Sequence, residues 1–203
     1  MDVLEQSRQQ RATAEAILRD LDLLNRWRRF GRPVLVGAVA IDVAFAPDLD
    51  MEIYCPTLRI EHGFQVLAEC AENPRVTSAQ FLNRLNTPDS ALYWQLHYQT
   101  DDDGVDWKID MWSAPEDYAL PRGEDFVRPM QNALTPETRR AILTLKAARA
   151  AGALPMFLSI DAYRAVLEDG VRTVDQWRAW RQTHETGALT DWKPTRRGPI
   201  TAF

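Results

Sequence analysis

Three short stretches of this sequence, Val36-Gly37-Ala38, Asp48-Leu49-Asp50-Met51 and Ile109-Asp110-Met111, determine the fold that we expect for it. In the second stretch acidic and apolar residues alternate with a period of two, which is typical of a β-strand with two unlike faces. Asp48 and Asp50 then project from the same face, ~7 Å apart along the strand, while the apolar residues beside them point into the core. The stretch therefore predicts a strand that presents two carboxylates side by side.

Asp110 supplies a third carboxylate, between two apolar residues on a later predicted strand. Three acids that meet on one face of a sheet repel one another strongly unless a cation lies among them. Hard divalent ions such as Mg²⁺ take oxygen ligands from carboxylates and from substrate phosphates. The turn at Gly37, followed by the start of a helix, offers backbone N–H groups to an anion. Together these features predict metal-assisted phosphate chemistry.

These residues resemble the signature of the DNA polymerase beta-like nucleotidyltransferase superfamily. That signature has a hydrophobic residue, a Gly and then a Gly or Ser; about a dozen residues later come an Asp, a hydrophobic residue and an acid, and a third acid follows on a later strand. The resemblance covers residues 33–113. The chain length and a helical C-terminal part are similar to those of the small-substrate branch, whose members include enzymes that adenylylate antibiotics.

The resemblance implies that Asp48, Asp50 and Asp110 are the catalytic residues and hold Mg²⁺ ions that bridge a nucleoside triphosphate such as ATP. An acceptor oxygen then attacks the α-phosphate in line, and pyrophosphate leaves. Gly37 and Ala38 are implied to bind the triphosphate, but the family usually has Ser or Gly where this chain has Ala38. The missing hydroxyl removes a hydrogen bond worth about 0.5–1.5 kcal/mol. The acceptor is expected to be a small molecule or a protein.

Three further polar residues on the predicted strands have more than one possible role. Lys108 shares a strand face with Asp110, so it is either a phosphate contact or a surface or ion-pairing residue. Glu52 continues the acidic face of its strand, either as a base toward an acceptor hydroxyl or as a solvated residue. His97 lies on the strand expected to pair with that of Asp110, where it borders the site or has a core or surface role.

Two alternatives to the catalytic interpretation remain open. In the first, the chain is a catalytically inactive member of the same fold that binds a nucleotide or a partner. The alanine at position 38 favours this alternative. Otherwise the match is accidental: Asp48 and Asp50 are solvated acids at a strand edge, and Asp110 pairs with Lys108 or an arginine in a purely structural role.

Periodicity and turn residues predict an α/β (α+β) fold, with a small mixed sheet flanked by helices and a helical C-terminal part. We expect a sheet domain with an N-terminal helix over residues 1–119 and a helical region over residues 120–203. A turn at residues 101–104 predicts an antiparallel hairpin. The remaining elements follow from the same signals: helices over residues 2–29, 38–45, 57–72 (Thr57 as N-cap), 135–152, 159–168 and from 173, and strands over residues 33–37, 48–54, 92–99 and 105–112.

Composition narrows the class of protein. The 203 residues include 24 Lys+Arg and 29 Asp+Glu, a formal net charge of −5, whereas a dedicated nucleic-acid binder usually shows a basic excess. A nucleic-acid partner is therefore not expected. Cys55 and Cys70 lack metal-ligand spacing and predict two buried thiols in a reducing compartment. With neither a secretory signal nor a membrane span in the sequence, we expect a cytoplasmic protein.

Overall fold

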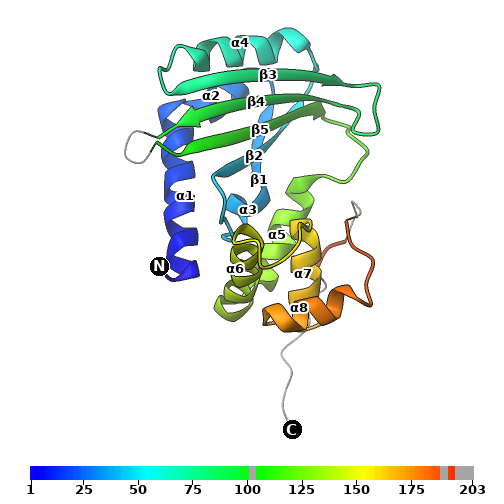
Figure 1. The fold of residues 1–203 in the computed structure, drawn as a ribbon. Helices are drawn as coiled ribbons and strands as arrows, with labels where there is room; N and C mark the ends of the chain where they lie inside the picture. Colours follow the sequence, from blue (N-terminus) through cyan, green and yellow to red (C-terminus); the bar gives the residue numbers. More distant parts are fainter. Residues whose placement is uncertain (101–103, 188–191, 195–203) are drawn as a thin grey trace.

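The structure is a computed structural model that describes residues 1–100, 104–187 and 192–194. Within these residues the chain forms one five-stranded sheet, packed with helices (Figure 1). The strands are β1 (Arg32–Val36), β2 (Asp48–Cys55), β3 (Val76–Arg84), β4 (Ala91–Gln99) and β5 (Asp106–Pro115). The helices are α1 (Val3–Asp20), α2 (Leu23–Arg28), α3 (Gly37–Ala40), α4 (Ile60–Ala71), α5 (Gly123–Ala133), α6 (Pro136–Ala150), α7 (Ser159–Leu167) and α8 (Val174–Arg181).

The sheet is mixed, with the strand order β1-β2-β5-β4-β3. Its central pair, β2 and β5, is parallel, and each of the other neighbouring pairs is antiparallel. Because parallel strands need a long crossover connection, the chain between β2 and β5 passes through α4, β3 and β4. This small mixed sheet flanked by helices is the predicted fold class.

One face of the sheet forms the first hydrophobic core. Leu49 and Met51 of β2, Ile109 of β5 and Trp94 of β4 are fully buried there. They belong to the same apolar cluster as buried residues of α1, α2 and α4. The alternate residues of these strands carry polar side chains to the opposite face, as the period of two predicts.

The helices α5 to α8 form a second core, which lies below the sheet in Figure 1. Trp177 and Trp180 are buried in it, against other helical residues rather than against the sheet. The cluster also includes Ile41 and Val43, which precede β2 in the sequence. The division into residues 1–119 and 120–203 stays a prediction.

Several local predictions are confirmed. β4 and β5 pair in antiparallel fashion, although the turn expected at residues 101–103 lies outside the described residues. Thr135 and Thr173 each cap a helix through a capping box. Gly152 and Gly170 follow α6 and α7 with positive φ angles of 72° and 68°, which glycine adopts without strain.

The predicted N-terminal helix is in fact two helices. α1 ends at Asp20, and α2 begins after Asp22, whose φ of 45° lies in the left-handed region. The break changes the direction of the chain so that α2 contacts α4, with Leu23 and Trp27 fully buried. Tertiary burial of these two side chains outweighs the uninterrupted helical periodicity of the sequence.

Two more local expectations were wrong. β3 was not predicted because it is an edge strand whose residues from Thr77 to Gln80 are all exposed and show no regular alternation of apolar and polar side chains. α4 starts at Ile60, so Thr57 lies before the helix and does not cap it.

Both cysteines are buried and free, as predicted. Burial raises the pKa of the Cys55 and Cys70 thiols to about 11, so both are protonated at neutral pH. Across the described ranges, no helix combines the length and the apolar character that crossing a membrane requires.

Candidate active site

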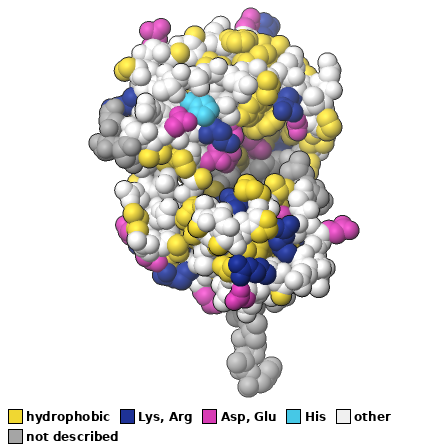
Figure 2. All heavy atoms as spheres, in the orientation of Figure 1, with side chains coloured by type: hydrophobic (Ala, Val, Ile, Leu, Met, Phe, Trp, Pro, Cys, Tyr) yellow, Lys and Arg dark blue, Asp and Glu magenta, His cyan; other side chains and the backbone are white. Residues whose placement is uncertain are grey.

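The parallel pairing of β2 with β5 brings three predicted acids together. Asp50 lies directly opposite Asp110 in the register, and Asp48 lies directly opposite Lys108. One carboxylate oxygen from each of Asp48, Asp50 and Asp110 lies within 4.8 Å of the other two. We call these three residues the acidic triad. Acidic and basic side chains gather in a hollow between the strands and the helices α5 to α8 (Figure 2).

Lys108 is the cation closest to the triad. Its Nζ lies 2.7 Å from Asp110 Oδ2 and 3.3 Å from Asp48 Oδ1. Burial lowers the pKa of Lys108, but the hydrogen bond from Lys108 to Asp110 and the charges of both acids outweigh burial and raise it above the usual range. The charge of the buried Lys146 also favours ionised Asp48 and Asp50, so two ammonium groups act on three carboxylates and an excess of negative charge remains when all are ionised.

Asp50 is the member of the triad for which ionisation is most unfavourable. Burial, followed by the charges of Asp48 and Asp110, raises its pKa to about 7. Burial also raises the pKa of Asp48, against the opposing effect of Lys108. Bringing a positive ion to these carboxylates would reverse the shift, because a nearby opposite charge favours the ionised form.

The hydrogen bonds around the triad are unequally distributed. Asp110 Oδ1 accepts from the Tyr93 hydroxyl at 2.6 Å and from Gln95 Nε2 at 3.0 Å. Asp48 Oδ1 is buried and accepts no hydrogen bond within the part of the chain that the structure describes. Among the same residues, none donates to the Asp50 carboxylate. Two of the three carboxylates therefore have lone pairs free for another ligand.

Gly37 packs directly against Asp50. It follows β1 with a φ of +67°, a conformation that residues with a Cβ rarely adopt. A Cβ built on Gly37 would lie only 2.0 Å from Asp50 Oδ2. Glycine at this position is thus required both by the backbone conformation and by the space that the carboxylate occupies.

These features fit a hard divalent cation. Mg²⁺ binds carboxylate oxygens and dehydrates reluctantly, so it is usually held by a few acidic side chains together with substrate phosphates. The triad supplies convergent oxygens, an excess of negative charge and a buried Asp48 oxygen that makes an ion pair with Lys108 but accepts no hydrogen bond from the described residues. Asp48, Asp50 and Asp110 are the residues that would hold such an ion.

No protein-family model and no curated protein matches this sequence. Two of the solved structures that are similar to it in fold are the following. A cytoplasmic RNA terminal U-transferase superposes with a TM-score of 0.52 and 15% identity, over 79% of this chain and 45% of that one. The non-canonical poly(A) polymerase complex GLD-2–GLD-3 gives a TM-score of 0.53 and 10% identity, over 89% of this chain and 64% of that one. This chain spans less than two thirds of either neighbour.

The chain has a nucleotidyltransferase fold. Both neighbours are named as enzymes that transfer nucleotides to RNA ends, and this chain shares their fold, so the fold implied by the resemblance in the sequence is confirmed. Affiliation with the small-substrate branch stays a prediction. In this nucleotidyltransferase fold the acids predicted from the sequence lie together, with Gly37 against Asp50 and Lys108 among them. The roles of Gly37, Ala38 and Lys108 toward a triphosphate stay predictions.

Tyr93 and Gln95 were missed by the sequence analysis, although they hold Asp110 in place. Both lie on β4, which pairs with β5 so that Gln95 is directly opposite Asp110. The signal was present in the sequence, because residues 93, 95 and 97 alternate with the apolar residues of the predicted strand. Only the register of the hairpin shows which of them reaches the acid.

Glu52 is not free to act as a base. Its carboxylate accepts hydrogen bonds from the backbone N–H groups of Gly123 at 2.8 Å and Glu124 at 3.2 Å, and from the Tyr54 hydroxyl. It therefore satisfies amides at the start of α5, which would otherwise lack partners. This arrangement corrects both sequence interpretations of Glu52, because the residue is neither a solvated acid nor an available base.

The pKa of Asp50 predicts how stability depends on pH. Between about pH 4 and pH 7 the folded protein binds more protons than the unfolded chain, because the pKa of Asp50 is raised by folding. The free energy of unfolding should therefore fall by about 2–4 kcal/mol as the pH rises through this window without Mg²⁺. Chemical denaturation at a series of pH values, with and without Mg²⁺, measures this slope. Mg²⁺ should flatten it, and an identical slope with and without the ion would contradict the metal assignment.

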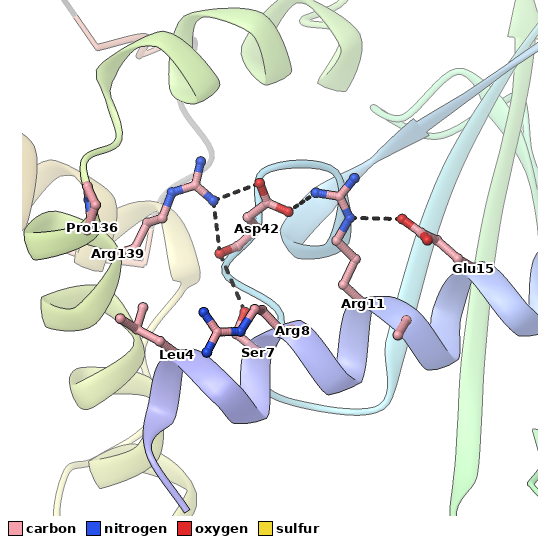
Figure 3. A pocket seen from close by; sticks show the side chains of 9 residues that line it. Leu4, Ser7, Arg8, Arg11, Glu15, Asp42, Pro136 and Arg139 are labelled. Carbon is pink, nitrogen blue, oxygen red and sulfur yellow. Dashed lines mark hydrogen bonds and ion pairs between the residues drawn. The ribbon is translucent and has the colours of Figure 1, made fainter.

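One pocket of the fold has none of the triad residues in its lining. Its volume is about 460 Å³, and it opens between α1, the loop after α3 and the start of α6. Asp42, from that loop, lies between Arg11 of α1 and Arg139 of α6, and its ion pair with Arg139 measures 2.8 Å (Figure 3). Burial opposes ionisation of Asp42, but hydrogen bonds from Arg139 and Arg11 outweigh it and lower its pKa. Asp42 thus ties the segment after α3 to both α1 and α6.

Replacing Asp42 by Ala is expected to lower the free energy of unfolding by about 2–3 kcal/mol. The change leaves two arginines without this partner and puts Ala at a φ of +58°, which Asp tolerates better. Urea unfolding measures the loss. Glu5→Ala, which removes the exposed partner of Arg8, is the matched control and should cost less than about 0.5 kcal/mol. Equal losses in the two variants would show that Asp42 is no more than a surface acid.

Proposed function

We propose that this protein catalyses Mg²⁺-dependent transfer of a nucleoside monophosphate from a nucleoside triphosphate to a small-molecule or protein acceptor. The observation that carries this proposal is the convergence of Asp48, Asp50 and Asp110 within 4.8 Å. These acids stand next to a glycine turn, in a fold shared with nucleotidyltransferases. ATP is the donor to test first, and we expect the protein to act in the cytoplasm.

The proposed mechanism depends on positioning and charge neutralisation. Asp48, Asp50 and Asp110 would hold the metal, which would supply positive charge against the triphosphate and the departing pyrophosphate. The backbone of Gly37 and Ala38 lies against the phosphates, and Lys108 exchanges its contact with the acids for a phosphate oxygen. The acceptor oxygen attacks the α-phosphorus in line while the bond to the pyrophosphate breaks.

The class of acceptor is the least constrained part of the proposal. The two structural neighbours are described as an RNA terminal U-transferase and a poly(A) polymerase complex, so an RNA acceptor must be tested beside the others. The net charge of −5 disfavours RNA, because phosphate contacts draw on a surplus of Lys and Arg. A small molecule or a protein is therefore the acceptor that we propose.

A second candidate function is nucleotide binding without turnover. Two observations favour it: Ala38 lacks the hydroxyl that the family usually has, and Lys108 already pairs with two of the acids. Such a protein would bind a triphosphate with Mg²⁺ but transfer nothing.

Two measurements test the proposal. Thermal unfolding of the wild-type protein is first followed with each common ribonucleoside triphosphate, in Mg²⁺ and in a chelator. Stabilisation that needs both Mg²⁺ and a triphosphate is expected, and its absence would mean that the triad has no nucleotide-binding role. Transfer of an α-phosphate label to small molecules, proteins and a single-stranded RNA is then measured. Binding without any transfer or pyrophosphate release would select the second candidate function.

A further inference from the structure

His97 and Asp106 form a hydrogen-bonded pair on the polar face of the sheet, beside the triad. His97 Nδ1 lies 2.6 Å from Asp106 Oδ2. In the register of β4 and β5, His97 is directly opposite Lys108, and Asp106 and Asp110 occupy the two diagonal positions. Opposite residues have Cβ atoms ~4.5–5.5 Å apart, and diagonal ones lie about 7–8 Å apart or slightly closer. His97 therefore borders the triad on its β4 side.

The Asp106 carboxylate determines which ring nitrogen of His97 can accept a proton. A carboxylate only accepts hydrogen bonds, so the Nδ1 that faces it carries the hydrogen of the neutral ring. Nε2 then holds the free lone pair, as in other carboxylate–histidine pairs. The His97 side chain is 32% exposed. Nε2 is thus a base that an incoming molecule can reach.

The geometry of in-line transfer places the acceptor on the same side as His97. The attacking oxygen and the leaving group must lie on opposite sides of the phosphorus. Gly37, the turn proposed to hold the phosphates, touches Asp50 from the β1 side of the triad. With the pyrophosphate at that turn, the acceptor approaches from the β4 side, where Gln95 and His97 project.

Each of the other carboxylates near this face either is proposed to bind the metal or already accepts hydrogen bonds. Asp48 and Asp50 carry the oxygens that are free for metal, and Glu52 is bound by the start of α5. Asp110 accepts two donors from β4 on one oxygen and Lys108 on the other. His97 Nε2 is the remaining base on this face of the described strands.

We propose that His97 is the catalytic base that deprotonates the acceptor, and that Asp106 is its positioning residue. This inference rests on the proposed nucleotidyl transfer. The acceptor O–H proton moves to His97 Nε2, and the oxygen lone pair forms the new bond to the α-phosphorus. The bond from that phosphorus to the bridging oxygen breaks, and its electron pair leaves with the pyrophosphate. The imidazolium then releases its proton to solvent, so the histidine is regenerated.

The kinetic test uses water as the acceptor, so the natural acceptor need not be known. Formation of AMP and pyrophosphate from ATP and Mg²⁺ is measured in single turnover. His97→Gln should lower the rate by about 100-fold or more, with unchanged ATP binding, and added imidazole should restore part of the activity of His97→Ala. His184→Gln, on the helical part of the chain, is the matched control and should behave like wild type. A His97→Gln rate within about threefold of wild type, or loss of ATP binding together with the rate, would overturn the role of His97 as the base.

A spectroscopic test is independent of turnover. Heteronuclear NMR of the imidazole nitrogens in the unliganded protein should show neutral His97 with its hydrogen on Nδ1, and Asp106→Asn should abolish that preference. A hydrogen on Nε2 in the wild type would rule out the base function. The two proposals fail separately, because wild-type protein without ATP binding or turnover contradicts nucleotidyl transfer itself, whereas an active His97→Gln contradicts only the assignment of the base.

Discussion

Replacing Asp50 by Asn is expected to abolish nucleotidyl transfer, lowering its rate at least about 1,000-fold. Asn has nearly the same shape as Asp but carries no charge, so the triad loses its innermost negative ligand while the packing against Gly37 stays similar. Transfer of an α-phosphate label measures the activity, and thermal unfolding with ATP and Mg²⁺ measures binding. Both signals should disappear in the variant.

The same substitution should make the metal-free protein more stable at neutral pH. It removes a carboxyl group whose pKa is raised to about 7 by burial and by two neighbouring acids. Asp175→Asn is the matched control, since the Asp175 side chain is 89% exposed on α8 and should affect neither signal. Transfer by Asp50→Asn at the wild-type rate would exclude Asp50 as a metal ligand. A destabilised, inactive Asp50→Asn would point instead to a structural role for this carboxylate.

Replacing Gly37 by Ala is expected to lower the free energy of unfolding by about 3 kcal/mol and to lower transfer about 100-fold. The new Cβ would lie 2.0 Å from Asp50 Oδ2, so either the turn or the carboxylate must move. Either movement displaces the Asp50 carboxylate from the carboxylates of Asp48 and Asp110. Urea unfolding and label transfer measure the two losses.

Gly152→Ala is the matched control for this change. Gly152 has a φ of +72°, close to that of Gly37, but a Cβ there meets nothing within 4 Å. It should therefore show only the backbone cost of a positive φ, about 1–2 kcal/mol, and no loss of transfer. The difference between the two variants isolates the contact with Asp50. If both variants lose the same stability and keep full activity, the close approach of Gly37 to the triad has no functional meaning.

The parts of the site that local sequence could predict are those that lie on single strands. Alternation across residues 48–54 is enough to place Asp48 and Asp50 on one face, since the side-chain period of a strand is two. The pairing of β2 with β5 could not be predicted from local sequence. Asp110 meets Asp50 because β5 pairs with β2 in parallel. The resemblance to a known family implied that the three acids lie together, whereas periodicity within one strand could not show it. Tyr93 and Gln95 needed the hairpin register as well.

The predictions about the fold that were wrong have a common physical origin. Asp22 interrupts the first helix because Leu23 and Trp27 find better burial when the chain turns, and no local propensity encodes that gain. β3 is half-exposed at the edge of the sheet, so its sequence lacks the alternation of the central strands. In both cases tertiary packing, rather than the local pattern, determined the structure.

The pairing of β2 with β5 also determines when the site forms during folding. Asp50 and Asp110 are far apart in sequence, and their strands can pair only after a long loop has closed, which is the slow, entropically costly part of folding. β4 must then add to β5 before Tyr93 and Gln95 can hold Asp110. A partly folded chain with independent helices would therefore contain every residue of the triad and no site. In this protein, metal binding should report completion of the sheet.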